Sequence, residues 1–214
     1  MPNQVNSSGL REFALPVLTN PLLQSIREQF ESAYLKQFGM RTGSGLYKNA
    51  DWRRLEFATS LIPDNCKSVL DVGVGPGAFL NFLSMSGRFD RVTGIDKRRY
   101  SKFIELAPNL DYRIMNVGKT SFPDASFDLV ICMEVLEHLD TATLTNALSE
   151  LRRITCKKLI MTVPFNEPLP LPSYHLQQFD ENRIRETFPS AEILLLHRNK
   201  EQSTWPWAVL VEEF

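Results

Sequence analysis

Residues 67–80 read Lys-Ser-Val-Leu-Asp-Val-Gly-Val-Gly-Pro-Gly-Ala-Phe-Leu, and this stretch decides the fold. The apolar run that begins at Val69 is long enough for one buried strand. Gly73, Gly75 and Gly77 follow where the strand must turn sharply into a helix, and glycine accepts the positive φ angles of such a turn. Apolar side chains at helical spacing come next. The stretch therefore predicts a strand, a glycine loop and a helix, the arrangement that holds phosphates or nucleosides in open α/β sheets.

Asp71, two residues before the first glycine, narrows the choice of ligand. A carboxylate beside the loop would repel the pyrophosphate of a dinucleotide, whereas it suits a ligand with an ammonium group and ribose hydroxyls. The spacing also departs from the dinucleotide fingerprint, because Pro76 and Gly77 lie inside the turn. A nicotinamide-dependent oxidoreductase is therefore disfavoured.

Two motifs carry a resemblance to a known family. Asp-Val-Gly-Val-Gly-Pro-Gly at 71–77 resembles the first motif of class I S-adenosylmethionine-dependent methyltransferases, D/E-x-G-x-G-x-G. Met-Glu-Val-Leu-Glu-His-Leu at 133–139, after Phe-Asp-Leu-Val, is similar to the motif that follows a strand in many small-molecule methyltransferases. The resemblance covers roughly residues 65–180. It implies an enzyme of class EC 2.1.1.- that uses S-adenosyl-L-methionine to methylate a small molecule at oxygen or nitrogen.

Strand-like and helix-like segments alternate after the glycine loop, which indicates a doubly wound, mostly parallel α/β sheet. The last two strands are too close in sequence for a crossover helix, so they should form an antiparallel hairpin. The resemblance implies the same architecture, a seven-stranded Rossmann-like methyltransferase sheet with an antiparallel last strand. Residues 1–18 are expected to be irregular. The strands expected after the loop are 91–95, 112–115, 127–133, 158–163, 191–197 and 205–211, and the helices are 97–106, 141–154 and 181–188.

Two helices are predicted before the sheet, and they cannot belong to its repeating unit. Asn20 is placed to cap the start of the first helix and Gly39 to end it, and a second helix stops at Pro63. We therefore expect a helical cap or lid at 1–64 and the cofactor-binding core at 65–214, within one structural domain. The two helices could be a packing cap or a lid over the substrate pocket, and the sequence favours neither.

Polar residues fall at the ends of successive predicted strands, where open α/β sheets bind their ligands. The Asp96 carboxylate can hold both ribose hydroxyls, and Asn116 is placed to meet the adenine edge. In the family this adenine-facing position is often acidic, and Asn116 keeps an acceptor without the charge. The expected cofactor-binding residues are Asp71, Gly73, Gly75, Gly77, Asp96, Lys97, Asn116, Val117, Met133 and Glu134.

His138 and His175 are the candidate catalytic residues. The sulfonium methyl of the cofactor is already activated, so a base is needed mainly for a hydroxyl acceptor, and histidine suits that role near neutral pH. Glu134, Glu137 and the two histidines also resemble the metal site of the small-RNA 2′-O-methyltransferases. Because the Glu-His motif is widespread in enzymes that use no metal, we expect no metal here.

The composition shows no bias toward a nucleic-acid or membrane partner. The 214 residues carry a formal net charge of -1, and no apolar run approaches the ~20 residues of a membrane span. The N-terminus lacks a signal-peptide pattern, and three cysteines without metal-type spacing indicate reduced thiols, so we expect a cytoplasmic protein with a small-molecule methyl acceptor. An RNA methyltransferase and a catalytically inactive S-adenosylmethionine-binding protein are the alternatives. The sequence identifies neither the acceptor nor the oligomeric state.

Overall fold

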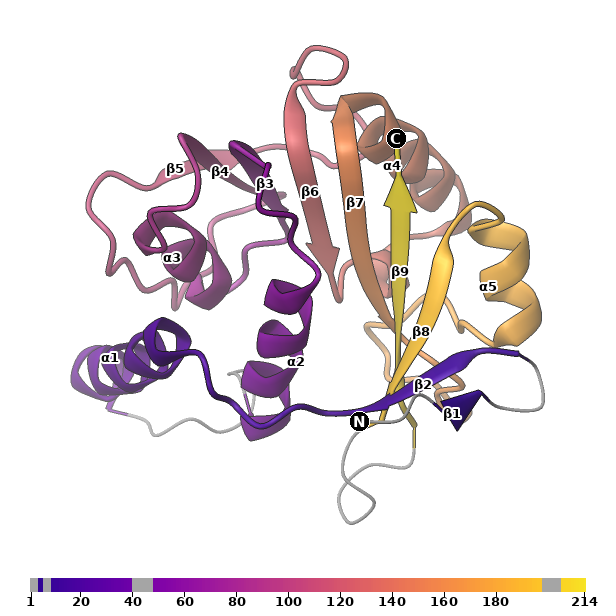
Figure 1. Ribbon diagram of the computed structural model, residues 1–214, viewed down its shortest axis with the longest axis horizontal. Helices are drawn as coiled ribbons and strands as arrows, with labels where there is room; N and C mark the ends of the chain where they lie inside the picture. Colours follow the sequence, from indigo (N-terminus) through magenta and orange to yellow (C-terminus); the bar gives the residue numbers. More distant parts are fainter. Residues whose placement is uncertain (1–3, 6–8, 40–47, 198–204) are drawn as a thin grey trace. The chain divides into compact units, whose positions relative to one another are not determined.

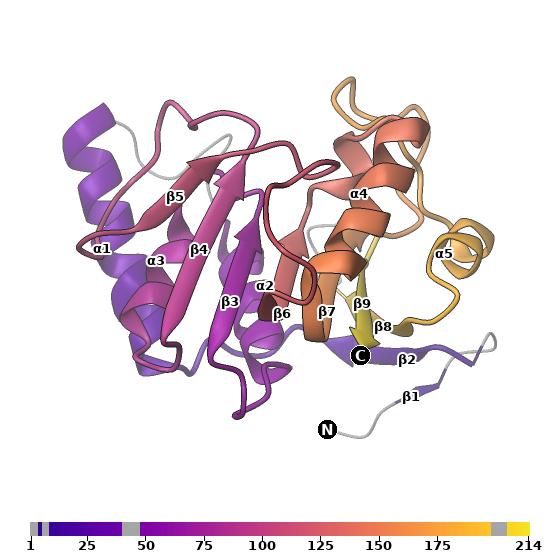
Figure 2. The same cartoon turned by 90° about the horizontal axis from the view of Figure 1, so that it is seen from above.

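The computed structural model describes residues 4–5, 9–39, 48–197 and 205–214. The chain divides into two compact units, one of residues 16–116 and one of residues 1–15 with 117–214. Figures 1 and 2 show the helices and strands of each unit. The predicted α/β class is confirmed, with parallel strands in both units and an antiparallel pair at the end of the chain. No helix among the described residues is long and apolar enough to cross a bilayer.

The unit of residues 16–116 contains three parallel strands in the order β3-β4-β5. β3 and β4 pair so that Asp71 lies opposite Gly94 and Val72 opposite Ile95. This register places the carboxyl ends of the two strands side by side. The elements of the unit are α1 (Pro21–Phe38), α2 (Asn49–Ser60), β3 (Ser68–Val72), α3 (Ala78–Met85), β4 (Arg91–Asp96) and β5 (Asp111–Ile114).

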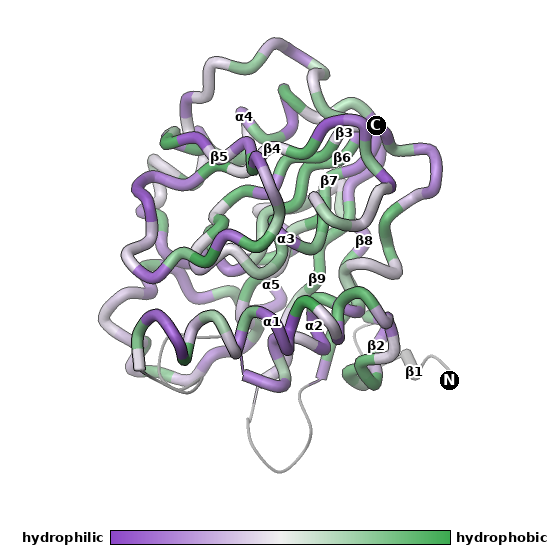
Figure 3. The backbone as a smooth tube through the Cα atoms, turned by 90° about the vertical axis from the view of Figure 1, so that its left-hand side faces the viewer, coloured by the Kyte–Doolittle hydropathy of each residue, from purple (hydrophilic) through white to green (hydrophobic). Residues whose placement is uncertain are grey.

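Local sequence signals set the ends of α1 as predicted. The side chain of Asn20 accepts a hydrogen bond from the Leu23 N–H (3.1 Å). Gly39 has a φ of 65°, and its N–H donates to the Leu35 carbonyl (2.9 Å). Both helices of this region alternate between hydrophilic and hydrophobic residues along their length, as Figure 3 shows for α1 and α2. The apolar side of each helix can therefore pack inward.

The second unit contains six strands among its described residues, in the order β1-β2-β8-β9-β7-β6. β6 and β7 are parallel, whereas β9 runs antiparallel to β7 and to β8. The predicted hairpin of the last two strands is thereby confirmed, and its connection, 198–204, lies outside the described residues. The elements are β1 (Gln4–Val5), β2 (Arg11–Ala14), β6 (Phe127–Met133), the 3-10 helix η1 (Leu136–His138), α4 (Thr141–Ile154), β7 (Thr155–Pro164), α5 (Glu181–Thr187), β8 (Glu192–His197) and β9 (Trp207–Glu213).

The N-terminal segment differs from the expectation of an irregular tail. β2 pairs in parallel with β8, and beyond it the Leu15 N–H donates to the His197 carbonyl. Leu10 and Leu15, on either side of β2, are buried. β2 occupies an edge of β8 that would otherwise present unpaired backbone groups. The pairing joins opposite ends of the chain, so no local pattern could predict it.

Residues 97–106 form turns and irregular structure in place of the predicted basic helix. Asn81 of α3, which is fully buried, organises the end of this segment. Its amide nitrogen donates to the carbonyls of Gly77 and Ile104, both at 2.8 Å. Its amide oxygen accepts from the N–H of Leu106 and from that of the next residue. The amide thus uses both donors and both acceptor positions, and it ties the segment to the start of α3.

We predict that Asn81→Leu lowers the free energy of unfolding by roughly 2–4 kcal/mol, because it leaves buried backbone donors and acceptors without a partner. Urea unfolding followed by circular dichroism measures the change. Asn146→Leu, at an exposed position of α4, is the matched control and should change stability by less than about 0.5 kcal/mol. Equal stability of the two variants would contradict the role given to Asn81.

Candidate active site

The glycine loop between β3 and α3 has the backbone that the sequence predicted. Gly73, Gly75 and Gly77 have φ angles of 79°, 54° and 102°. A Cβ added at Gly77 would lie 2.7 Å from Cε2 of Phe103 and 2.8 Å from the carbonyl oxygen of Ile104. Glycine is therefore required at this position both by the backbone angle and by the close approach of the chain that follows β4.

Asp96, at the end of β4, contacts the loop directly. Its Oδ2 accepts a hydrogen bond from the Gly75 N–H at 3.1 Å. The Gly73 N–H donates to the carbonyl of Ile95, the residue before Asp96, at 2.8 Å. These two bonds connect the end of β4 to the glycine loop, so that one carboxylate oxygen of Asp96 supports the loop.

Asp71 lies at the end of β3 and is 4% exposed. Burial raises the pKa of its carboxyl group from 3.8 to about 7, and the negative charge of Asp96 contributes further to the rise. The carboxyl group is therefore partly protonated near pH 7. A ligand that brings a positive charge to this place would favour the ionised form.

The other two predicted cofactor residues of this unit lie at its surface. Lys97 directly follows β4 and Asn116 follows β5, and both are exposed. The Met115 N–H donates to the Asp96 carbonyl at 2.9 Å, which holds the chain before Asn116 against the end of β4. The structure thus brings the glycine loop, Asp96 and the approach to Asn116 together.

Tyr112 is a candidate residue of the site around the glycine loop that the sequence did not indicate. Its ring stacks on Phe103 with the centroids 4.9 Å apart and an angle of 2° between the planes. Its hydroxyl donates to the Arg98 carbonyl at 3.0 Å. Burial, and next the charge of Asp96, raises the pKa of this hydroxyl. Phe103 also borders the glycine loop, but no signal in the sequence pointed to this pair, because residues 97–106 were expected to form a helix.

Val117, Met133 and Glu134, the remaining predicted cofactor residues, belong to the other unit. Glu134 has a φ of 55°, a left-handed conformation that is uncommon for a residue other than glycine. Its carboxylate accepts from the Thr162 hydroxyl at 2.9 Å and from the Trp207 indole N–H at 2.8 Å. These bonds attach Glu134 to β7 and β9. The part of all three residues in cofactor binding stays a prediction.

Both candidate catalytic histidines have one ring nitrogen bonded to an oxygen. The Nδ1 of His138 lies 2.8 Å from the Tyr174 carbonyl, which can only accept, so this nitrogen carries the hydrogen. The Nδ1 of His175 lies 2.5 Å from Oε2 of Glu167, a residue that the sequence reasoning did not select. The two imidazole rings are 5.0 Å apart. In the neutral rings Nε2 is then the nitrogen that can accept, and Nε2 of His138 lies 3.9 Å from Oε1 of Glu137.

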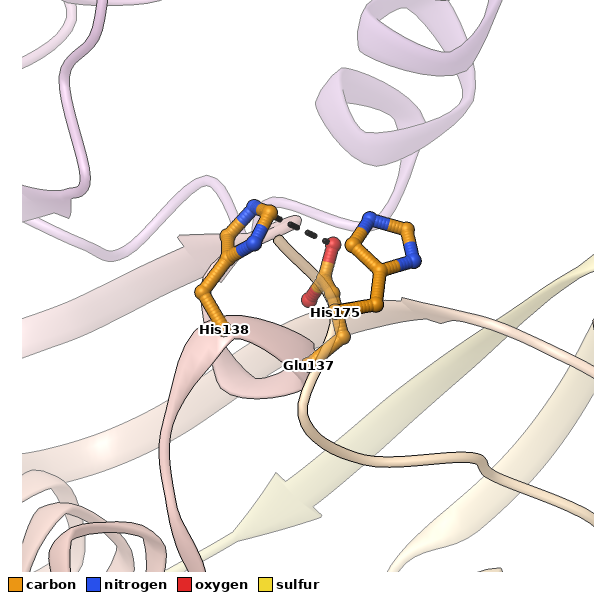
Figure 4. A group of neighbouring side chains, drawn as sticks. All are labelled: Glu137, His138 and His175. Atoms are coloured by element: carbon orange, nitrogen blue, oxygen red, sulfur yellow. Dashed lines mark ion pairs between the residues drawn. The ribbon is translucent and has the colours of Figure 1, made fainter. Parts of the chain in front are cut away.

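Glu137, His138 and His175 form a compact group that could hold a divalent cation. One ligand atom from each residue lies within 4.8 Å of the others, and Figure 4 shows the Glu137 carboxylate between the two imidazole rings. Two imidazoles and one carboxylate are a donor set that divalent transition metals accept. Glu134, the fourth residue of the predicted set, instead directs its carboxylate to Thr162 and Trp207. The absence of a metal stays a prediction.

Comparison with known sequences finds similarity in the middle of the chain, which includes the glycine loop. Residues 70–160 match a protein family described as "Methyltransferase domain". The chain is 37% identical over 109 residues to the ubiquinone biosynthesis O-methyltransferase of Albidiferax ferrireducens, and the match covers 46% of this chain and 42% of that protein. The chain spans less than half the length of the curated relatives it matches.

Solved structures share the fold. Magnesium protoporphyrin IX methyltransferase of Synechocystis PCC 6803, determined with bound SAM, has a TM-score of 0.54 and 19% identity, over 91% of this chain and 99% of that one. The [4+2]-cyclase SpnF has a TM-score of 0.62 and 13% identity, over 94% of this chain and 98% of that one. The fold is therefore the Rossmann-like methyltransferase fold. The match of residues 70–160 to a methyltransferase family supports S-adenosyl-L-methionine as the cofactor.

We predict that S-adenosylhomocysteine, which carries the same ammonium group as S-adenosylmethionine, binds about 10-fold more weakly at pH 6 than at pH 8. The raised pKa of Asp71, about 7, means that the carboxylate is mostly ionised at pH 8 and mostly protonated at pH 6. Isothermal titration calorimetry across this range measures the affinity. Asp71→Asn should bind weakly at every pH, and an unchanged pH dependence in this variant would contradict the assignment.

Proposed function

We propose that this protein is a methyltransferase that transfers the methyl group of S-adenosyl-L-methionine to a small-molecule acceptor. The observation that carries the proposal is the hydrogen bond from the Gly75 N–H to Asp96, beside the buried carboxyl group of Asp71. The match of residues 70–160 to a methyltransferase domain supports it. One carboxylate would accept from ribose hydroxyls, and the other would face the ammonium group of the cofactor.

The reaction requires little acid–base machinery from the protein. The sulfonium supplies an activated methyl group, so alignment of the acceptor atom with the methyl carbon, and exclusion of water, provide most of the rate enhancement. A hydroxyl acceptor must also lose a proton. His138 and His175 are the proposed bases, because each has its Nδ1 bonded to an oxygen and its Nε2 in the neutral ring can accept.

A small molecule is the favoured acceptor because the net charge of -1 provides no general attraction to RNA. The name of the matched relative, an O-methyltransferase of ubiquinone biosynthesis, agrees with oxygen as the acceptor atom. An RNA methyltransferase and an inactive cofactor-binding protein are the alternatives. The cap or lid at 1–64 and the cytoplasmic location stay predictions.

We predict that Asp96→Ala and Gly75→Val each weaken binding of S-adenosylmethionine by roughly 100-fold or more. The first change removes the acceptor for the ribose hydroxyls and for the Gly75 N–H, and the second forces a branched side chain onto a φ of 54°. Calorimetric titration with S-adenosylmethionine, S-adenosylhomocysteine and NAD measures the effect.

Asp64→Ala is the matched control for these two variants, because the Asp64 side chain is fully exposed and pairs with Arg88. It should bind the cofactor like the wild type. Tight binding of NAD without binding of S-adenosylmethionine would overturn the proposed function.

We predict that a screen of small hydroxyl and amine compounds detects an acceptor by release of S-adenosylhomocysteine, and that turnover survives exhaustive chelation. The second expectation follows from the activated sulfonium, which needs no metal to transfer its methyl group. Loss of turnover on chelation, with recovery on adding a divalent cation, would instead assign Glu137, His138 and His175 as ligands.

A further inference from the structure

Glu167 and His175 form a buried carboxylate–imidazole pair. Oε2 of Glu167 lies 2.5 Å from Nδ1 of His175, and the two side chains are 5% and 10% exposed. A carboxylate near neutral pH can only accept, so Nδ1 must carry the hydrogen. The neutral ring then has its lone pair on Nε2. The bond to Glu167 therefore fixes both the tautomer and the orientation of the His175 ring. A histidine ring in water has no such fixed orientation or hydrogen-bond partner.

The backbone on both sides of the pair is held in place. The Asn166 N–H donates to the Phe179 carbonyl at 2.9 Å, and the Gln178 side chain donates to the Glu167 carbonyl at 2.8 Å. The His175 N–H donates to the carbonyl of Pro172 at 2.9 Å. These bonds close the segment 166–179 onto itself. The carboxylate therefore meets the imidazole in a fixed position, as an orienting group must.

His138 and His175 differ in the charge of the group that orients them. The Nδ1 of His138 donates to the neutral Tyr174 carbonyl, whereas the Nδ1 of His175 donates to a carboxylate. When a base accepts a proton its ring becomes positive, and a buried negative partner stabilises that ring more than a carbonyl does. The buried Glu137 carboxylate also lies near His138, with its Oε1 3.9 Å from Nε2, but this distance is too long for a hydrogen bond and does not orient the ring. His175 is thus the histidine of the two whose ring is oriented by a hydrogen-bonded carboxylate, which favours it as the base.

We propose that Glu167 is a positioning residue that orients His175 as the proton acceptor for a hydroxyl substrate. The inference rests on the proposed methyl transfer and narrows its acceptor to an alcohol or a phenol. The acceptor oxygen forms a bond to the methyl carbon as the C–S bond of the cofactor breaks. The electron pair of the C–S bond stays on sulfur, which gives S-adenosylhomocysteine. The hydroxyl proton passes to Nε2 of His175, and Glu167 balances the charge of the imidazolium.

The first test is the tautomer of His175, which does not require methyl transfer. The chain has three histidines, so ¹⁵N-labelled histidine gives three ring systems, assigned with His138→Gln and His197→Gln. We expect the Nδ1–H tautomer of His175 in the wild type, a shift toward the Nε2–H tautomer in Glu167→Ala, and recovery of Nδ1–H in Glu167→Asp. An unchanged tautomer in Glu167→Ala would overturn the proposal even if the protein methylates its acceptor.

The second test uses the acceptor found by the screen. We expect Glu167→Ala to lower kcat by roughly 10²-fold while KM and the affinity for S-adenosylhomocysteine change less than about 2-fold, with partial recovery in Glu167→Asp. Because the two residues act as a unit, Glu167→Ala should cause no further loss in a His175→Ala background. Additive losses, or full kcat in Glu167→Ala, would overturn the proposal.

Glu181→Ala is the matched control, since Glu181 lies at the start of α5 and pairs with Arg185 at the surface. It should keep the tautomer and kcat of the wild type. Failure of the wild type to bind S-adenosylmethionine would refute the proposed function alone, because the tautomer measurement still decides whether Glu167 orients His175. A requirement of turnover for a divalent cation would refute the base role of His175.

Discussion

The carboxyl groups of Asp71 and Asp96 stand at the ends of two neighbouring parallel strands, and the burial of Asp71 beside the charge of Asp96 is the constraint on which the cofactor site depends. The Asp96 carboxylate accepts a hydrogen bond from the Gly75 N–H, which stabilises its negative charge. Asp71 is buried, and its pKa rises to about 7. A buried carboxyl group with a raised pKa opposes folding as it ionises. Asp71 therefore lowers the free energy of unfolding of the unliganded protein at neutral pH. A ligand that brings an ammonium group relieves that cost, which couples cofactor binding to the stability of residues 16–116.

The segment after β4 shows how the same unit supports this site without a regular helix. Asn81 connects this segment to the start of α3 with four hydrogen bonds, and Phe103 closes against Gly77 so tightly that a Cβ would collide. Tyr112 then stacks on Phe103. The glycine loop is thus packed on one side by a chain segment whose own shape depends on a single buried amide.

In the other unit, the two candidate catalytic histidines each have an oxygen acceptor that selects one tautomer of the neutral ring. His138 and His175 each donate from Nδ1, to a carbonyl and to a carboxylate respectively. The sequence indicated both histidines through the family motif. It did not indicate Glu167, because the proline-rich segment around this residue carries no periodicity. Glu167 can orient His175 only because the fold holds its backbone beside the imidazole ring.

Local signals in the sequence were sufficient for the ends of α1, the positive φ angles of the glycine loop and the C-terminal hairpin, since caps, glycines and short connections act over a few residues. Composition and spacing also determined the α/β class. Only the tertiary structure decided the pairing of β2 with β8, the turns at 97–106 and the pair of Glu167 with His175. Each of these depends on hydrogen bonds between segments that meet only after folding. A buried polar group must form its hydrogen bonds with the groups that folding brings beside it.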